Sequence, residues 1–349
     1  MRVGLSLLTL VPGVSGGSET YARELVRALA KVGRHEYTVY LPRIAADVEG
    51  LTTEVVGEYH ASHSMGGRVV AMARASAFGG GIRRRFVDVD AHHFPLSVMI
   101  PRIERIPAAT TVLDIQHEFL PEFFSRAELV YRRRVYGWSV RRSRIVITIS
   151  RHAAETLVER LGVPEDRVRP IHLGLDHELF RLADERRGEF LLYPARGWPH
   201  KNHARLFQAF AELRRRHPGL ELVLTAYEGE VPEGVRSLGR VSHPELVRLY
   251  QTAAALVFPS LYEGFGQPPL EAMACGCPVA SSDAASLPEV VGNAARLFDP
   301  TSIEEIVAAV DEVLTNPEDW RRRGLERAAA FSWEATARAH EAVYAELVA

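Results

Sequence analysis

Cysteine is almost absent from the sequence. The 349-residue chain contains two cysteines, Cys275 and Cys277, which are separated by one residue. Two such neighbours cannot cross-link a domain, and two metal ligands without further partners make a poor metal site. The chain also has no apolar run near the roughly 20 residues that a membrane-spanning helix needs. We therefore expect a reduced, cytoplasmic protein without a disulfide, a metal or a membrane span.

The sequence has no large excess of charge of either sign. The net charge of −2 and the pI of about 6.7 give no general attraction to nucleic acid. Residues 1–175 nevertheless carry 24 basic and 18 acidic side chains, whereas the remainder carries 18 and 26. Arginines gather at residues 83–85 and 132–144 of this positive half. These clusters are either solvated faces or a dock for an anionic acceptor or a membrane surface.

The glycine pattern of dinucleotide-binding proteins is missing as well. Gly13, Gly16 and Gly17 do not fit the spacing G-x-G-x-x-G, which argues against a dehydrogenase. Gly16 and Gly17 precede a helical pattern that begins near Glu19, with Ser18 as a possible N-cap. This glycine pair is either a contact for an anion or sugar at a helix N-terminus, or a tight turn.

Glycine, proline and glutamate are concentrated in one stretch, residues 262–278. It follows a short apolar run at residues 253–259 that is typical of a strand buried in a parallel sheet. Gly264 and Gly266 allow the backbone N–H groups around Phe265 to approach a ligand closely. Prolines follow them and suit the first turn of a helix, whose N-terminus favours anions. The stretch therefore predicts a phosphate site.

Two glutamates, Glu263 and Glu271, lie eight positions apart on either side of this predicted site. Carboxylates repel phosphate but accept hydrogen bonds from sugar hydroxyls. We expect the two side chains to bind sugars on opposite sides of a diphosphate. The alternative is an ordinary loop rich in glycine and proline, with solvated acids.

Lysine is nearly as rare as cysteine. Lys31 and Lys201 are the only two among 42 basic residues. Lys201 lies in a loop before an amphipathic helix pattern, five positions after Arg196. A compact ammonium group binds phosphate as a point charge, and an arginine can supply a second cation. We predict that Arg196 and Lys201 bind the diphosphate, the alternative being a solvated loop pair.

The run E-G-F-G-x-P-x-x-E-A-x-A-x-G-x-P resembles the Glu-x7-Glu signature of the retaining glycosyltransferases of family 4. The resemblance implies the GT-B fold, an α/β architecture of two Rossmann-like domains that face each other across a cleft. It suggests an acceptor-side domain at residues 1–182 and a nucleotide-sugar-binding domain at residues 183–330. A helix at residues 331–349 would then cross back to the first domain.

The resemblance also implies a reaction, the transfer of a glycosyl unit from a nucleoside-diphosphate sugar with retention and without a required metal or cofactor. Glu263 would hold the donor sugar, Glu271 the ribose, and Arg196 with Lys201 the diphosphate. The run D-I-Q-H-E-F-L-P-E-F-F-S at residues 114–125 resembles a variant found among these enzymes. His117 would then contact the sugar from the first domain, although a histidine that simply ends a strand is the alternative.

The runs D-x-Q-H and W-P-H-K-N are similar to those of mannosyltransferases, which makes GDP-mannose the first candidate donor and UDP-sugars the next. The acceptor would be a glycan or a lipid-linked molecule, with possible contact to the membrane surface. Two other functions stay open. One is an epimerase or phosphorylase on the same fold, and the other is a non-catalytic subunit that binds nucleotide sugars.

Overall fold

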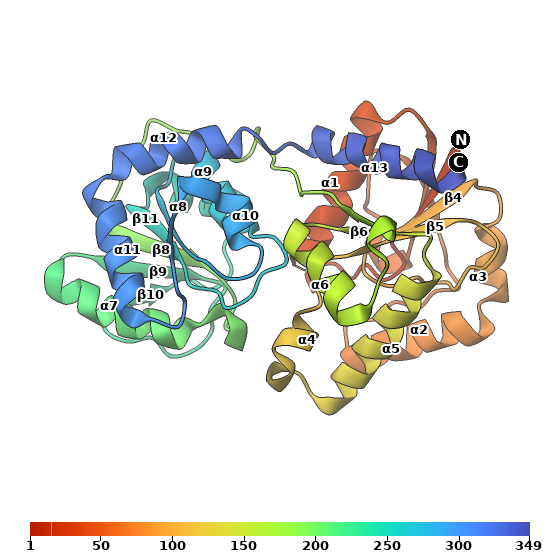
Figure 1. Cartoon of the computed structure of the whole chain (residues 1–349), viewed down its shortest axis with the longest axis horizontal. Coiled ribbons are helices and arrows are strands. Elements are labelled where there is room, and N and C mark those ends of the chain that lie inside the picture. Colours follow the sequence, from red (N-terminus) through yellow and green to blue (C-terminus); the bar gives the residue numbers. More distant parts are fainter. Residues whose placement is uncertain (15) are drawn as a thin grey trace. The chain divides into compact units, whose positions relative to one another are not determined.

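The computed structural model describes residues 1–14 and 16–349. Tertiary contacts divide the chain into two compact units, shown in Figure 1. The first unit consists of residues 1–174 and 333–349, and the second of residues 175–332. The first segment therefore ends before residue 182, where the sequence suggested a boundary.

The first unit is built on a parallel sheet in the order β3-β2-β1-β4-β5-β6-β7. Its central strands β4, β5 and β6 are buried at every position, which is typical of a parallel sheet covered on both faces, although they include polar histidines and threonines. The strands are β1 (Arg2–Ser6), β2 (Glu36–Leu41), β3 (Thr52–Val55), β4 (Ala91–Phe94), β5 (Ala108–Val112), β6 (Ile145–Thr148) and β7 (Val168–Pro170).

Helices connect these strands. They are α1 (Gly17–Val32), η1 (Arg43–Ala45), α2 (Met65–Phe78), α3 (Gly80–Arg85), α4 (Gln116–Phe119), η2 (Pro121–Phe123), α5 (Arg126–Arg142), α6 (Arg151–Leu161) and η3 (Glu165–Arg167). Among the described residues, every helix of the chain is too short or too polar to traverse a lipid bilayer.

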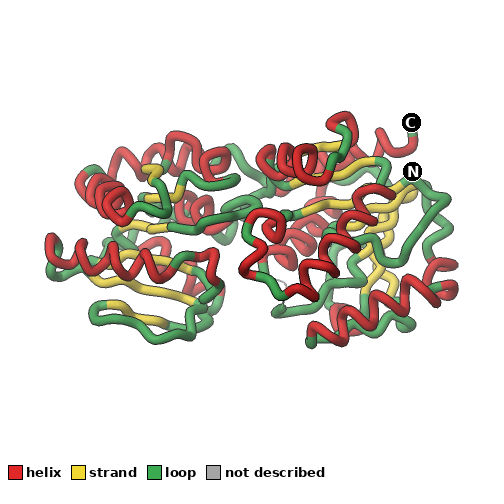
Figure 2. The backbone as a smooth tube through the Cα atoms, turned by 60° about the horizontal axis from the view of Figure 1, so that its bottom comes forward, coloured by secondary structure: helices red, strands yellow, loops and turns green. Residues whose placement is uncertain are grey.

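The second unit repeats this architecture with a parallel sheet in the order β10-β9-β8-β11-β12-β13. Figure 2 shows helices on both sides of its strands. The strands are β8 (Phe190–Pro194), β9 (Glu221–Thr225), β10 (Val235–Ser237), β11 (Ala255–Phe258), β12 (Val279–Ser282) and β13 (Arg296–Phe298). The helices are η4 (Pro199–Lys201), α7 (His203–Arg216), α8 (His243–Thr252), α9 (Gln267–Ala274), α10 (Leu287–Val291), η5 (Gly292–Ala294), α11 (Ile303–Thr315) and α12 (Pro317–Ala328).

The last helix, α13 (Trp333–Val348), belongs to the first unit. It lies along α1 in Figure 1 and also packs against β4 and β5. Its side chains Ala337, Val343, Tyr344 and Leu347 are buried, as are the polar side chains Thr336, His340 and Glu341.

A chain of buried hydrogen bonds joins α13 to the sheet. His340 Nδ1 lies 2.8 Å from the Thr336 carbonyl oxygen, which only accepts, so Nδ1 carries the proton and Nε2 accepts from Tyr21. The remaining directions follow one by one. The Tyr344 hydroxyl donates to His93 Nδ1, and His93 Nε2–H donates to the Thr111 hydroxyl. The Thr111 hydroxyl donates to that of Tyr21, which donates to His340 Nε2, and His340 Nδ1–H donates to the Thr336 carbonyl oxygen. The five distances are 2.7 to 2.9 Å. Every donor has an acceptor only while both histidines are neutral.

Candidate functional site

The residues of the second unit that we predicted to bind the nucleotide-sugar donor lie at the point where the strand order of its sheet reverses. β8 pairs with β9 on one side and with β11 on the other, so the chain turns in opposite directions after β8 and β11. Ligands of open parallel sheets bind in the crevice at such a point, beyond the carboxyl ends of the strands. The loop after β8 contains Arg196 and Lys201, and the loop after β11 contains Glu263 to Gly266.

Lys201 and Glu263 form an ion pair beyond the carboxyl ends of β8 and β11. The ammonium nitrogen lies 2.6 Å from Glu263 Oε1, and the two side chains are only 13% and 15% exposed. The ammonium also lies 5.5 Å from the centroid of the Phe258 ring. The predicted diphosphate ligand and the predicted sugar ligand are thus neighbours, although 62 positions separate them in the sequence.

Buried hydrogen bonds hold Lys201 in this position. Tyr193, fully buried on β8, donates its hydroxyl proton to the Lys201 carbonyl oxygen at 2.7 Å. Asn202 follows with a φ of 61°, a left-handed conformation that asparagine tolerates. Its amide nitrogen donates to the carbonyl oxygens of Pro259 and Pro300 at 3.0 and 2.8 Å. The loop after β8 is therefore tied to the loop after β11.

Arg196 is half-buried and belongs to the same loop as Lys201. Its guanidinium carbon is 5.3 Å from the centroid of the Trp198 ring, and its carbonyl oxygen accepts from the Trp198 N–H at 2.8 Å. Trp198 is 48% exposed. Stacking on an indole leaves the N–H edges of a guanidinium available for hydrogen bonds to phosphate.

Ser286, which the sequence did not single out, holds the loop of residues 263–266, called the glycine loop below, by hydrogen bonding to its backbone. Its hydroxyl is fully buried and lies 2.9 Å from the Glu263 carbonyl oxygen and 2.7 Å from that of Phe265. In a planar trans peptide, the carbonyl and the following N–H point in opposite directions. Since both carbonyls face Ser286, the N–H groups of Gly264 and Gly266 both point away from it. The dipoles of these two peptide groups therefore both have their positive N–H ends directed away from Ser286.

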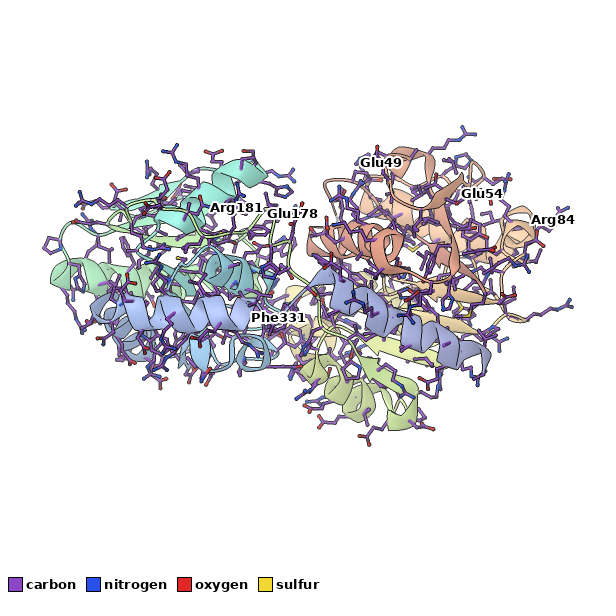
Figure 3. The ribbon with its side chains drawn as sticks, turned by 90° about the horizontal axis from the view of Figure 1, so that it is seen from above. Glu49, Glu54, Arg84, Glu178, Arg181 and Phe331 are labelled. Carbon is purple, nitrogen blue, oxygen red and sulfur yellow. The ribbon has the colours of Figure 1, made fainter. Side chains whose placement is uncertain are left out.

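The remaining contacts of this loop explain why position 266 is a glycine and how Phe265 is packed. Gly266 has a φ of 119°, and a Cβ atom there would lie 2.7 Å from Leu287 Cδ2. Phe265 is buried, and its ring lies edge-on to that of Phe331, labelled in Figure 3, with 5.9 Å between the centroids. The loop therefore enters α9 in a conformation that a side chain at position 266 would disturb.

We predict that Ser286→Ala destabilises the second unit and weakens donor binding. The variant leaves two buried carbonyl groups without this partner, and an unsatisfied buried group costs about 1–3 kcal/mol. Urea unfolding measures the loss of stability, and nucleotide-induced thermal stabilisation measures binding. Ser282→Ala is the matched control, because Ser282 is equally buried and its hydroxyl bonds the Ser260 carbonyl oxygen at 2.8 Å. Equal loss of binding in both variants would contradict a specific role for Ser286.

Glu271 lies on α9 and is half-buried. Its Oε2 accepts a hydrogen bond of 2.9 Å from the Tyr250 hydroxyl. Shielding from water raises the pKa of the carboxyl group to about 7, against which the hydrogen bond from Tyr250 acts. An ionised Glu271 can accept hydrogen bonds from a pair of hydroxyl groups, whereas the protonated form loses part of that capacity.

His117 lies in the first unit, on the short helix α4, and its side chain is only 1% exposed. The imidazole is edge-on to Tyr136 and Phe124, with centroid distances of 5.4 and 6.3 Å. Burial, followed by the charge of Arg132, lowers the pKa of His117, which favours the neutral ring. Its Nδ1 has no hydrogen-bond partner among the described residues. The predicted contact of His117 with the donor sugar stays a prediction.

Gly16 and Gly17, the predicted ligand contact of the first unit, lie at the start of α1, and the N-cap of this helix differs from the one we expected. α1 begins at Gly17, and the N-cap is Gly16 with a φ of 53°, so the prediction of Ser18 as the cap is wrong. The helix N-terminus already holds a carboxylate, since Glu19 Oε2 accepts from the Gly13 N–H at 2.8 Å. The positive φ explains the glycine at position 16, while its predicted contact with an anion or sugar stays untested.

Two family models cover most of the chain. The model of "Glycosyltransferase Family 4" matches residues 15–179, and that of "Glycosyl transferases group 1" matches residues 178–330. O-antigen chain mannosyltransferase B from Escherichia coli is 32% identical over 278 residues, which is 70% of this chain and 71% of that protein. The MMP alpha-(1->4)-mannosyltransferase from Mycolicibacterium hassiacum is 32% identical over 243 residues, or 62% of this chain and 59% of that enzyme.

Solved structures show the same fold at lower sequence identity. Sucrose-phosphate synthase from Thermosynechococcus elongatus superposes with a TM-score of 0.78 at 20% identity, covering 99% of both chains. HepE from Anabaena, solved with UDP and glucose, gives 0.74 at 16% identity and covers 99% of this chain and 100% of that one. The fold is therefore that of the GT-B glycosyltransferases. The chain therefore belongs to the glycosyltransferases described by these two family models.

Proposed function

We propose that the protein transfers a mannosyl unit from a nucleoside-diphosphate mannose to a glycan or lipid-linked acceptor, with retention at the anomeric carbon. GDP-mannose is the first candidate donor, and a UDP-sugar is the next. The mannosyltransferase relatives support the sugar, and HepE, solved with UDP and glucose, supports a nucleoside diphosphate as the leaving group. We further propose that the reaction requires no metal or other cofactor and takes place in the cytoplasm.

The ion pair between Lys201 and Glu263 carries this proposal. A cation and a carboxylate, each mostly shielded from water, meet beyond the carboxyl ends of the strands, which is where open parallel sheets bind ligands. A nucleoside-diphosphate sugar matches the pair, because its phosphate attracts the ammonium and its sugar hydroxyls can donate to the carboxylate. Donor binding would replace the direct ion pair by these two contacts.

In the proposed reaction, opposite charges develop on the leaving diphosphate and on the sugar. When the glycosidic bond breaks, the leaving diphosphate gains negative charge and the sugar becomes oxocarbenium-like. Lys201 and Arg196 would stabilise the diphosphate, together with the aligned backbone dipoles of the glycine loop. Glu263 would bind the sugar hydroxyls and favour its developing positive charge, and Glu271 would accept from the ribose. The acceptor hydroxyl would attack on the face that the diphosphate leaves, and the departing phosphate would take its proton.

The first unit would complete the reaction. His117 would contact the donor sugar, and Gly16 and Gly17 would offer a backbone contact to the sugar or its phosphate. The acceptor would bind to this unit. A lipid-linked acceptor would require the protein to work at a membrane surface.

A panel of nucleotides and nucleotide sugars tests the proposal. A ligand at 100 times its dissociation constant should raise the free energy of unfolding by about 2.7 kcal/mol. We expect GDP and GDP-mannose to stabilise the protein more than UDP, ADP and their sugars. Stabilisation by UDP-glucose alone would overturn the assignment of the donor, and the absence of any stabilisation would overturn the proposed function.

Product analysis separates the alternatives. A transferase yields a free nucleoside diphosphate and a glycoside whose anomeric configuration, seen by NMR, equals that of the donor. An epimerase would return a changed nucleotide sugar, and a phosphorylase would consume phosphate. A binding subunit would be stabilised by the donor without turnover in the presence of any acceptor.

A further inference from the structure

Helix α12 contributes an arginine to the interior of the second unit. α12 lies along α9 in Figure 1 and packs against α9 and η5. Arg322 and Arg323 form ion pairs with acids of their own helix, at positions 319 and 326. Arg327, near the end of α12, is half-buried, and burial lowers its pKa. A guanidinium remains charged when it is buried, so hydrogen bonds within the unit replace the water that it loses.

Arg327 bonds the last turn of α10. Its Nε donates to the Val290 carbonyl oxygen at 2.8 Å, and a terminal nitrogen donates to that of Glu289 at 2.6 Å. Carbonyl groups in the last turn of a helix lack partners within the helix, and the helix dipole favours a cation beside them. α10 has only five residues, and a helix of that length is not stable by itself. Arg327 therefore holds this short helix in place.

The opposite end of α10 holds the glycine loop. Ser286 precedes the first residue of the helix, and its hydroxyl bonds the carbonyl oxygens of Glu263 and Phe265. The glycine loop is thus tied to one end of α10 and Arg327 to the other. A five-residue helix is only about 7.5 Å long, so it moves as one piece. A displacement of its last turn would therefore also shift Ser286 and the loop carbonyls.

Arg327 also reaches the glycine loop through aromatic side chains. Its guanidinium carbon lies 4.8 Å from the centroid of the Phe331 ring, and that ring is edge-on to Phe265. Both phenylalanines are buried, and Phe331 is labelled in Figure 3. His177 fixes the backbone at this point, since its Nε2–H donates to the Phe331 carbonyl oxygen at 2.8 Å. Two routes from Arg327 therefore end at Phe265, one at its carbonyl group and one at its ring.

We propose that Arg327 is a positioning residue for the reaction: it holds α10 and Phe331 against the glycine loop, so that the N–H groups of Gly264 and Gly266 keep their common direction. The inference rests on the proposed function, which assigns these dipoles to the charge that develops on the leaving diphosphate. Such stabilisation depends on dipoles that are already oriented before the bond breaks. A loop free to move would have to be reordered in every turnover. Arg327 acts without touching the donor.

Steady-state kinetics of Arg327→Ala, measured well below its unfolding temperature, test the inference. We expect kcat to fall about tenfold or more, since a misplacement of about 1 Å can cost a hundredfold even when the mutation is remote from the chemistry. KM for the donor should rise less, because the loop acts mainly on charge that appears in the transition state. Arg327→Lys keeps the charge and the stem, which favours folding. It should lose kcat as well, because an ammonium group lacks the planar fork that bonds two carbonyls and stacks on a ring.

Arg323→Ala is the matched control. Arg323 lies one turn earlier on α12 and also stacks on an aromatic ring, that of Trp320, at 5.1 Å. Its ion pair with Asp319 stays within α12. Arg323→Ala should keep the wild-type kcat and KM. The inference is overturned if both variants lose kcat alike, or if Arg327→Ala keeps the wild-type kinetics and loses only thermal stability.

A double variant tests whether Arg327 and Ser286 act on the same loop. Ser286→Ala breaks one of the two routes, and Arg327→Ala breaks both. The loss of kcat/KM in the combined variant should therefore be clearly smaller than the product of the two single losses. Losses that multiply would show that the two residues act independently, which contradicts the inference.

Hydrogen exchange separates this inference from the proposed function, because it needs no donor. The backbone amides of residues 263–267 should exchange about tenfold faster or more in Arg327→Ala than in the wild type and in Arg323→Ala, the factor expected for the loss of a hydrogen bond to a charged group. If exchange accelerates while no nucleotide stabilises the wild type, the hold of Arg327 on the loop stands and the proposed function fails. If nucleotides stabilise the wild type and exchange is unchanged in Arg327→Ala, the proposed function stands and this inference is overturned.

Discussion

Lys201→Ala should lower kcat/KM for the donor about a hundredfold to a thousandfold, the usual effect of removing one group that stabilises transition-state charge. The variant removes the ammonium that lies 2.6 Å from Glu263 and that we assign to the leaving diphosphate. It should also abolish stabilisation by the nucleoside diphosphate alone. Steady-state kinetics and thermal unfolding measure the two effects.

The chain offers an unusually clean control for this variant, since its only other lysine is Lys31. Lys31 is 63% exposed on α1 and lies 3.9 Å from Glu334. Lys31→Ala makes the same chemical change and should leave kcat/KM and donor stabilisation unaltered. Full donor stabilisation in Lys201→Ala would show that the diphosphate binds elsewhere.

Acid should loosen α13 from the first unit well before general acid unfolding. Burial lowers the pKa of His340 from 6.5 to about 4 and that of His93 well below 6.5. In the unfolded chain these histidines become protonated below pH 6.5, whereas in the folded chain His340 stays neutral down to about pH 4. Stability is complete above pH 6.5 and falls toward pH 4, by about 3 kcal/mol for His340 alone. Hydrogen exchange of α13 amides, measured from pH 7 to pH 5, follows the loss after correction for intrinsic exchange rates.

His340→Gln separates this effect from other titrations. The variant should be less stable at pH 7, because the hydrogen-bond chain through Tyr21 is broken. Its α13 amides should show a weaker dependence on pH, because one buried group no longer titrates. His63→Gln, at an exposed position, should retain the wild-type pH dependence. An unchanged pH dependence in His340→Gln would contradict the assignment to this histidine.

Local patterns in the sequence predicted the fold well. The short apolar run at residues 253–259 becomes β11, and the glycines and prolines that follow it lead into α9. These features depend on a few adjacent residues. The glycine triplet at residues 79–81 would by itself favour a loop, but the structure continues as a helix there. α3 begins at Gly80 because Ile82 packs into the core cluster beside α2, which offsets the low helix propensity of glycine.

The candidate site was less accessible from the sequence, because its contacts are long-range. The patterns selected Lys201 and Glu263 separately, whereas their direct pairing follows from the parallel pairing of β8 with β11. Ser286 carried one local signal, its position before Leu-Pro-Glu at a helix start. That signal predicts an N-cap, but its side chain makes no capping bond and its hydroxyl lies against the carbonyls of the glycine loop. Only the tertiary structure shows this use.

The assignment of α13 to the first unit also fixes an order of events during synthesis. The second unit is one continuous segment, so all of it is synthesised before α13. The first unit cannot be finished at that stage, because His93, Thr111 and Tyr21 still lack their partners on α13. The bonds that join its sheet to α13 can form only after the roughly 160 residues of the second unit have been made, at roughly 5–20 residues per second. During that time the nascent first unit lacks its last helix, and this is the stage at which a chaperone can protect it.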